Sequence, residues 1–282
     1  MNNGFCGWYF RCRSDDGTVA LIPAVHTSNG EKSGSVQLIS SQGYYNFPIQ
    51  RAPIVVRSDI PYAALGSSLF SGREVSLDLV TPEFYAKGEL HFVALTPLKY
   101  DIMGPFSFVP ALECRHSVIS MRHTVNGWLD INGKNFVFKD ADGYIEGDRG
   151  RSFPKRYAWT QSFFDGGSLM MSLADIPLGR RAFTGIIGVI TLGDREYRLA
   201  TYLGAAALKI SGGEIAIRQR DLAFTAKLLE KSSFPLRAPV MGAMDRTIRE
   251  NVSCKAAYRL TKGGKTLLDF DTDAAAFEFE YP

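Results

Sequence analysis

Hydrophobic and polar residues alternate with a period of two along most of the chain. Clear examples are residues 18–25, 36–39, 74–80, 89–95, 117–123, 168–173, 188–192, 196–202, 214–220 and 266–270. This period places successive side chains on opposite faces of a β-strand, so each segment is predicted to be a strand. Turn sequences such as Asp15-Asp16-Gly17 and Asn132-Gly133 separate the segments. The pattern predicts an all-β fold of roughly twenty short strands.

Helical periodicity is weak throughout the chain. Only residues 223–231 and 241–251 come near a helical pattern, and both also fit strands. An antiparallel barrel or sandwich is therefore favoured over βαβ units.

The strand pattern repeats once along the chain. Residues 8–22 and 159–173 each contain an aromatic strand, an Asp/Gly turn and an apolar strand. Further matches follow in the same order, pairing 74–87 with 214–227, 132–134 with 263–265, and 145–146 with 277–278. The order is kept while the offset falls from about 151 to about 132 residues, as loop-length differences would produce. We therefore predict two β-domains related by internal duplication, residues 1–148 and 149–282.

Charge and composition narrow the classes of partner. The 282 residues include 32 Lys+Arg and 29 Asp+Glu, a net charge of +3, with 45% hydrophobic and 22% charged residues. This is globular composition without the basic excess of a nucleic-acid-binding protein, so no nucleic-acid partner is expected. The two predicted domains differ in charge, because residues 1–148 have a net charge of −3 and residues 149–282 have a net charge of +6.

The sequence also bears on compartment and cofactors. The amino terminus has no basic region followed by an apolar one, and no apolar run approaches the ~20 residues of a membrane helix. The four cysteines include no CxxC pair and are expected to be free thiols of a cytoplasmic protein. No dinucleotide or phosphate loop is present, so no cofactor is predicted. Peripheral membrane contact and the oligomeric state are left open.

Two motifs carry a family resemblance. Residues 143–161 read Gly-Tyr-Ile-Glu-Gly-Asp-Arg-Gly-Arg-Ser-Phe-Pro-Lys-Arg-Tyr-Ala-Trp-Thr-Gln, and residues 7–11 read Gly-Trp-Tyr-Phe-Arg. The longer string resembles the signature of the tocopherol cyclase family, and the shorter one resembles the opening of that family and of the related carotenoid hydratases. Arg149 and Tyr157 stand at positions where the family usually or often has Trp.

The resemblance implies a pair of lipocalin-like β-domains with a site for an apolar ligand. The named reaction of the family closes a chromanol ring from a prenylated hydroquinone, by protonation of an alkene and capture of the cation by the phenol oxygen. It implies a cyclase or isomerase acting on a hydrophobic prenylated small molecule. A non-catalytic lipocalin-like carrier of such a ligand is the alternative, and a structural protein of paired β-domains is a third class.

Protonation of an alkene needs an acid held away from water, and burial or a neighbouring carboxylate provides one. Glu146 and Asp148 are two residues apart, so on a strand they share a face as a candidate catalytic pair. The alternative is a turn in which Asp148 caps the backbone and Glu146 pairs with a nearby cation.

His116 and His123 are the next catalytic candidates, as a proton relay or as a hydrogen-bonding partner of the phenol. Regular alternation puts them on opposite faces, and a structural role is the alternative for each. Cys114 and His116, with Glu113 nearby, lack the spacing of a metal site, so no metal is predicted.

The remaining candidates would contact the ligand. Aromatic faces stabilise carbocations, and the repeat gives the two tryptophans equivalent positions. The predicted ligand-binding residues are Trp8, Tyr9, Glu113, Arg115, Tyr144, Trp159 and Gln161. Core packing is the alternative for Trp8 and Trp159, and a solvated linker is the alternative for the basic run that includes Arg115.

Overall fold

The computed structural model describes residues 3–49, 53–109, 112–178, 181–230 and 233–282. Apart from two short 3-10 turns, η1 (Gly104–Phe108) and η2 (Thr201–Leu203), the regular elements described are all β-strands. The all-β prediction is confirmed. Of the two stretches with some helical character, residues 223–228 lie in β18 (Leu222–Leu228) and residues 243–251 lie in β20 (Ala243–Lys262), while residue 231 lies outside the described residues.

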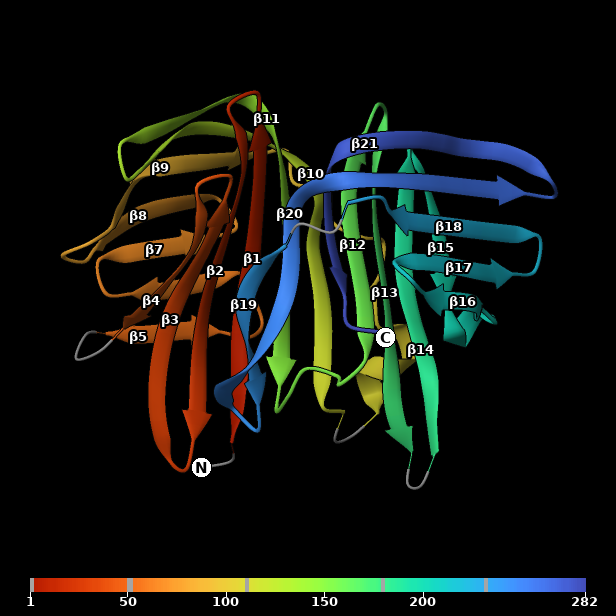
Figure 1. The fold of residues 1–282 in the computed structure, drawn as a ribbon, viewed down its shortest axis with the longest axis horizontal. Coiled ribbons are helices and arrows are strands. Elements are labelled where there is room, and N and C mark those ends of the chain that lie inside the picture. The colour runs from red at the N-terminus through yellow and green to blue at the C-terminus, as the bar shows by residue number, and fades with distance from the viewer. Residues whose placement is uncertain (1–2, 50–52, 110–111, 179–180, 231–232) are drawn as a thin grey trace. The chain divides into compact units, whose positions relative to one another are not determined.

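The first sheet contains eleven antiparallel strands (Figure 1). In sheet order they are β4 (Gly43–Ile49), β3 (Glu31–Ser40), β2 (Gly17–Ser28), β1 (Gly4–Ser14), β11 (Lys134–Gly150), β10 (Cys114–Ile131), β9 (Tyr85–Val93), β8 (Glu74–Val80), β7 (Ser68–Ser71), β6 (Tyr62–Leu65) and β5 (Ile54–Arg57).

The second sheet contains ten strands. In sheet order they are β15 (Arg195–Ala200), β14 (Arg181–Leu192), β13 (Gly167–Leu178), β12 (Tyr157–Phe164), β21 (Lys265–Phe279), β20, β18, β17 (Glu214–Gln219) and β16 (Ala206–Ser211), with β19 (Phe234–Val240) paired to β20.

The two sheets share their connectivity. In each, the first strand pairs with the last one, β1 with β11 and β12 with β21, and the next three strands follow outward in chain order. This repeated order supports the predicted duplication. The duplication itself, and the boundary between residues 148 and 149, stay predictions.

The chain divides into two compact units. Unit 1 comprises Met1–Asp101, Pro110–Phe153 and Leu236–Thr247, and unit 2 comprises Ile102–Val109, Pro154–Pro235 and Ile248–Pro282. Each unit has its own hydrophobic cluster.

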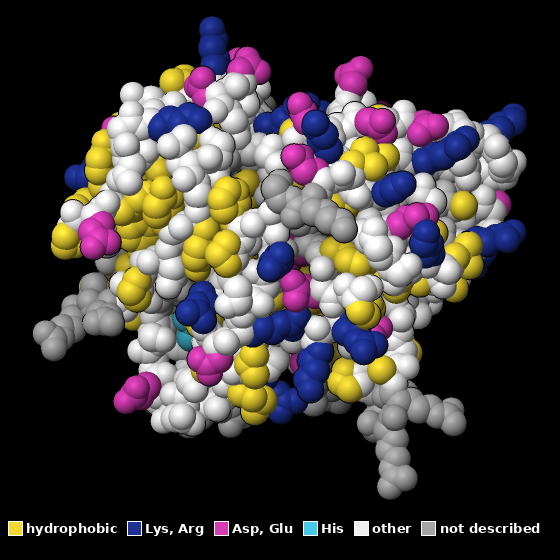
Figure 2. Space-filling view, viewed as in Figure 1, with side chains coloured by type: hydrophobic (Ala, Val, Ile, Leu, Met, Phe, Trp, Pro, Cys, Tyr) yellow, Lys and Arg dark blue, Asp and Glu magenta, His cyan; other side chains and the backbone are white. Residues whose placement is uncertain are grey.

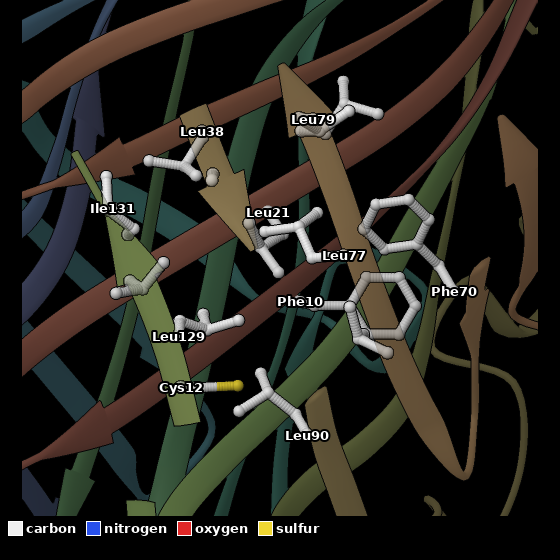
Figure 3. Packing of buried hydrophobic residues seen from close by; sticks show 14 of the residues in the cluster. Phe10, Cys12, Leu21, Leu38, Phe70, Leu77, Leu79, Leu90, Leu129 and Ile131 are labelled. Atoms are coloured by element: carbon white, nitrogen blue, oxygen red, sulfur yellow. The ribbon is translucent and has the colours of Figure 1, made fainter. Parts of the chain in front are cut away.

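Side chains from nearly every strand of the first sheet meet in one core (Figure 3). Phe10, Leu38, Phe70 and Leu129 come from β1, β3, β7 and β10, and all are fully buried. Side chains so far apart in a sheet can meet only if the sheet curls on itself. The interior of unit 1 is therefore packed with hydrophobic side chains.

The face that β11 turns to this core changes along its length. Phe138 and Ile145 both belong to the core although they are an odd number of residues apart. The switch occurs between two pairs of the ladder, in which Val125 of β10 lies opposite Ala141 and Gly127 lies opposite Phe138. Between these pairs β11 has two residues where β10 has one, and one of the two, Asp140, has a φ of 49°. Such a β-bulge reverses the faces, so the even-numbered residues that follow point away from the core.

Charged side chains of both signs lie on the surface. The face seen in Figure 2 has Lys and Arg interspersed with Asp and Glu. Cys6, Cys12, Cys114 and Cys254, all within the described residues, form no disulfide bond. Within the described ranges, no helix is long and apolar enough to cross a membrane.

Candidate functional site

Three polar side chains of β11 share the sheet face opposite the core of unit 1. Tyr144, Glu146 and Asp148 alternate with core-facing residues after the bulge. His116 of β10 lies directly across from Asp148 in the antiparallel ladder, and directly opposite residues project to the same face. The structure therefore brings together three of the four side chains predicted to be catalytic.

The ring of His116 lies between the two carboxylates. Its Nδ1 is 3.0 Å from Oδ1 of Asp148, and its Nε2 is 3.2 Å from Oε2 of Glu146. The first contact is a hydrogen bond, whereas the second is an ion-pair contact without hydrogen-bond alignment. Exposure of the side chains rises from 7% for Glu146 through 11% for His116 to 24% for Asp148. Glu146 is thus the inner carboxylate and Asp148 the outer one.

The protonation of His116 follows from these neighbours. Burial by itself favours the neutral ring, but the charges and hydrogen bonds of Glu146 and Asp148 outweigh it and hold the pKa of His116 well above its usual value. The two carboxyl groups therefore favour the imidazolium form of His116.

Tyr144 supports the inner carboxylate. Its hydroxyl donates to Oε2 of Glu146 at 2.5 Å, the oxygen that Nε2 of His116 approaches. Burial and the charge of Glu146 raise the pKa of Tyr144 well above its usual value, so the phenol keeps its proton and remains a donor.

Removal of this hydroxyl tests its contribution. We expect Tyr144→Phe to reduce the free energy of unfolding by about 1–3 kcal/mol, because a buried carboxylate loses a donor. Urea denaturation measures the change. Tyr85→Phe is the matched control, since Tyr85 also donates to a carboxylate, Asp130, but at a more exposed position. Equal losses in the two variants would contradict the role given to burial.

The glycines of the motif make room for rings on the core face. A Cβ on Gly147 would lie 2.3 Å from Cε3 of Trp8, and one on Gly143 would lie 2.2 Å from Nε2 of His123. These distances are shorter than van der Waals contact, so the alternation of glycine with Tyr144 and Glu146 has a packing reason.

Substitution of Gly147 should show this packing directly. Gly147→Ala is expected to lower the free energy of unfolding by about 1–3 kcal/mol through overpacking against Trp8. In the double variant with Trp8→Leu, the smaller side chain removes the clash, so the two losses should not add. Thermal or urea unfolding of the four proteins provides the cycle, and simple additivity would count against the clash.

Trp8 lies on the other face from Glu146, so the structure does not bring these two residues together. Trp8 is part of the core, and its Nε1 donates to the carbonyl of Arg57 at 2.9 Å. Nη1 of Arg149 donates to the next carbonyl, that of Ser58, at 2.5 Å. Both side chains hold the turn after β5, in agreement with the packing alternative for Trp8.

His123 is also separated from the site. It lies opposite Gly143 on the core face, with its ring 4.8 Å from that of Phe92 and Nδ1 3.1 Å from the Ser120 hydroxyl. Burial lowers the pKa of His123 to about 4, so the ring is neutral. The two bulges between His116 and His123 offset each other, and the histidines occupy opposite faces as the alternation indicates.

Of the remaining predicted ligand residues of unit 1, one lies on the sheet face of Glu146 and the others do not. Tyr9 lies opposite Glu146 and is buried on the site face, next to Tyr144. Arg115 lies opposite Arg149, on the face away from His116. Glu113 is exposed, and its carbonyl accepts hydrogen bonds from the backbone at Arg151 and Ser152.

Trp159 and Gln161 belong to β12 in unit 2. Trp159 lies opposite Glu278, and Gln161 lies opposite Ala276. Both are buried on the face away from the core of unit 2, to which the adjacent Ala158 contributes. Tyr157 donates a short hydrogen bond to Glu278, so unit 2 has a buried tyrosine–glutamate contact of its own.

Reasoning from the sequence did not indicate Arg11 as a site residue, and it suggested Cys114 only as a weak metal ligand. Arg11 is fully buried and lies opposite Tyr144 on the site face. A cation inside the apolar segment 8–12 is the signal that indicates it. Cys114 donates from Sγ to Oδ1 of Asp148 at 3.4 Å. Cys114 lies two residues before His116, so both share one face of a strand, and this spacing is the signal in the sequence that indicates it.

The donor atoms of His116, Glu146 and Asp148 lie within 4.8 Å of one another, a spacing that metal ligands also have. Ligands converge on one point, however, and His116 directs its two nitrogens to different carboxylates. A single ring can offer a metal only one of these atoms. The arrangement fits a bridging imidazolium ion better than a metal centre.

Two antiparallel sheets, each with its first strand paired to its last and with its own hydrophobic core, form the architecture of paired lipocalin-like β-proteins. The family model described as tocopherol cyclase-like matches residues 91–279. The chain belongs to this family. No curated protein matches the sequence.

Solved structures show the same fold at low sequence identity. A putative AttH from Nitrosomonas europaea has a TM-score of 0.56 at 9% identity, covering 100% of this chain and 93% of that one. Kievitone hydratase from Nectria haematococca has a TM-score of 0.56 at 8% identity, covering 99% and 89%. CghA with Sch210972 has a TM-score of 0.61 at 10% identity, covering 98% and 88%. At these identities the likeness concerns the fold.

Proposed function

We propose that the protein is an enzyme that binds a prenylated aromatic or similar hydrophobic molecule and closes a ring by protonating an alkene. The observation that carries this proposal is the position of His116 between Glu146 and Asp148 on a largely buried strand face. Membership of the tocopherol cyclase-like family supports the substrate class.

The three groups have different roles in this proposal. His116 stores the proton, and Glu146, the more buried carboxylate, passes it to the alkene once substrate binding brings Nε2 of His116 and Oε2 of Glu146, 3.2 Å apart, into hydrogen-bond alignment. The new C–H bond leaves a tertiary cation, which the negative charge of Asp148 stabilises. The phenol oxygen then forms a C–O bond and releases its proton to the site. The site regains from the phenol the one proton that it donated to the alkene, so substrate and product are isomers.

Two tyrosines would support the proton donor and contact the substrate. Tyr144 fixes Glu146 through its hydroxyl, and Tyr9 presents an aromatic ring on the same face. Aromatic faces stabilise a developing cation without supplying water to quench it. Trp159 and Gln161 of unit 2 remain proposed ligand contacts.

Binding and turnover measured together test the proposal. The wild-type protein should bind a prenylated hydroquinone, seen by quenching of tryptophan fluorescence, and convert it to the chromanol, seen by chromatography. Binding without conversion would contradict the enzymatic proposal and indicate the carrier alternative. Absence of both would contradict the substrate class.

A further inference from the structure

Cys114 makes a contact that the proposed reaction does not use. It lies two residues before His116 on β10, so both side chains project to one face. Both also donate to the same oxygen: Sγ of Cys114 is 3.4 Å and Nδ1 of His116 is 3.0 Å from Oδ1 of Asp148. The outer carboxylate is thus fixed from two positions on a single strand.

The thiol is kept in its donor form. Burial raises the pKa of Cys114 well above its usual value, and the charge of Asp148 adds to this effect. At neutral pH the group is therefore an S–H donor and not a thiolate, which would repel Asp148.

The backbone around Cys114 is held closely against β11. Cys114 lies opposite Gly150, and a Cβ on Gly150 would lie 2.0 Å from the carbonyl oxygen of Glu113 and 2.9 Å from Cα of Cys114. The amides of Arg151 and Ser152 donate to that same Glu113 carbonyl. Only glycine allows this approach, which sets the thiol at a defined position relative to Asp148.

We propose that Cys114 is a positioning residue, whose thiol orients the Asp148 carboxylate so that His116 stays between Asp148 and Glu146. This rests on the proposed acid site, but it does not require that the reaction be ring closure. The groups facing His116 from its own strand and from β11 are Cys114, Tyr144, Glu146 and Asp148.

The test measures the titration of His116 by NMR of the imidazole, which needs no substrate. Cys114→Ala should lower the pKa of His116 by about 0.5 to 1 pH unit, because a loosened Asp148 makes a weaker hydrogen bond. Cys114→Ser retains a donor and should keep the wild-type titration. Cys6→Ala is the matched control, since the Cys6 thiol contacts the carbonyl of Arg57 and not a carboxylate.

The outcomes separate positioning from simple packing. A lower pKa in Cys114→Ala, with wild-type values in Cys114→Ser and Cys6→Ala, supports the proposal. An unchanged His116 titration in Cys114→Ala, or an equal fall in Cys114→Ser, would overturn it. The readout stands even if the protein turns over no prenylated hydroquinone, so failure of the proposed function is recognised separately.

Discussion

Glu146→Gln is expected to reduce the rate of ring closure by about 10²- to 10⁴-fold, the usual contribution of a positioned proton donor. Glutamine keeps the size of the side chain, and its carbonyl oxygen still accepts the hydrogen bond from Tyr144. The amide cannot pass on the proton that His116 holds. Turnover should fall while binding of the hydroquinone changes little.

Two further variants compare Glu146 with the outer carboxylate and with a carboxylate outside the site. Asp148→Asn should cost less than Glu146→Gln, because Asp148 is the more exposed carboxylate and acts through its charge. Glu89→Gln on β9 removes an exposed carboxylate away from the site and should retain full turnover. Full activity in Glu146→Gln would remove Glu146 from the mechanism.

The second large effect concerns stability and its pH dependence. His116→Gln removes the cation between two carboxylates, so we expect the free energy of unfolding to fall by about 3–5 kcal/mol near pH 6. The folded-state pKa of His116 is raised above its unfolded value. The stabilisation is therefore complete below the unfolded pKa of about 6.5 and is lost as pH rises through the folded pKa.

Urea denaturation of both proteins between pH 6 and pH 10 measures this difference. The difference in free energy of unfolding between wild type and His116→Gln should be largest at pH 6 and should decrease as pH rises. His91→Gln is the matched control, because His91 is exposed on β9 and its loss should change stability by less than about 0.5 kcal/mol. A difference that grows with pH would mean that the ring is neutral in the folded protein.

The alternation of residues predicted the all-β class and located most of each named strand, but residues 94–95 and 201–202 lie beyond the ends of β9 and β15, the latter in the 3-10 turn η2. It also correctly separated the faces of His116 and His123, because the two bulges between them offset each other. Repeats of strand, turn and strand indicated two β-domains, and the shared order of the sheets supports this.

The neighbours of Glu146 could not be derived in the same way. Whether Trp8 or Tyr9 lies beside Glu146 depends on the register between β1 and β11, which are distant in the sequence. A shift of one residue exchanges the faces, and no local pattern specifies it. The bulge near Asp140 is a second such feature, since unbroken alternation would turn Glu146 toward the same face as Phe138.

Deuterium incorporation shows whether the proton reaches the alkene through Glu146. Wild-type protein and Glu146→Gln are incubated with a prenylated hydroquinone in D₂O, and the chromanol is examined by mass spectrometry and NMR. We expect one deuterium per ring closed by the wild type, on the former alkene carbon adjacent to the C–O carbon, and almost no product from Glu146→Gln. A chromanol without that deuterium, or equal labelled product from both proteins, would contradict proton delivery through Glu146.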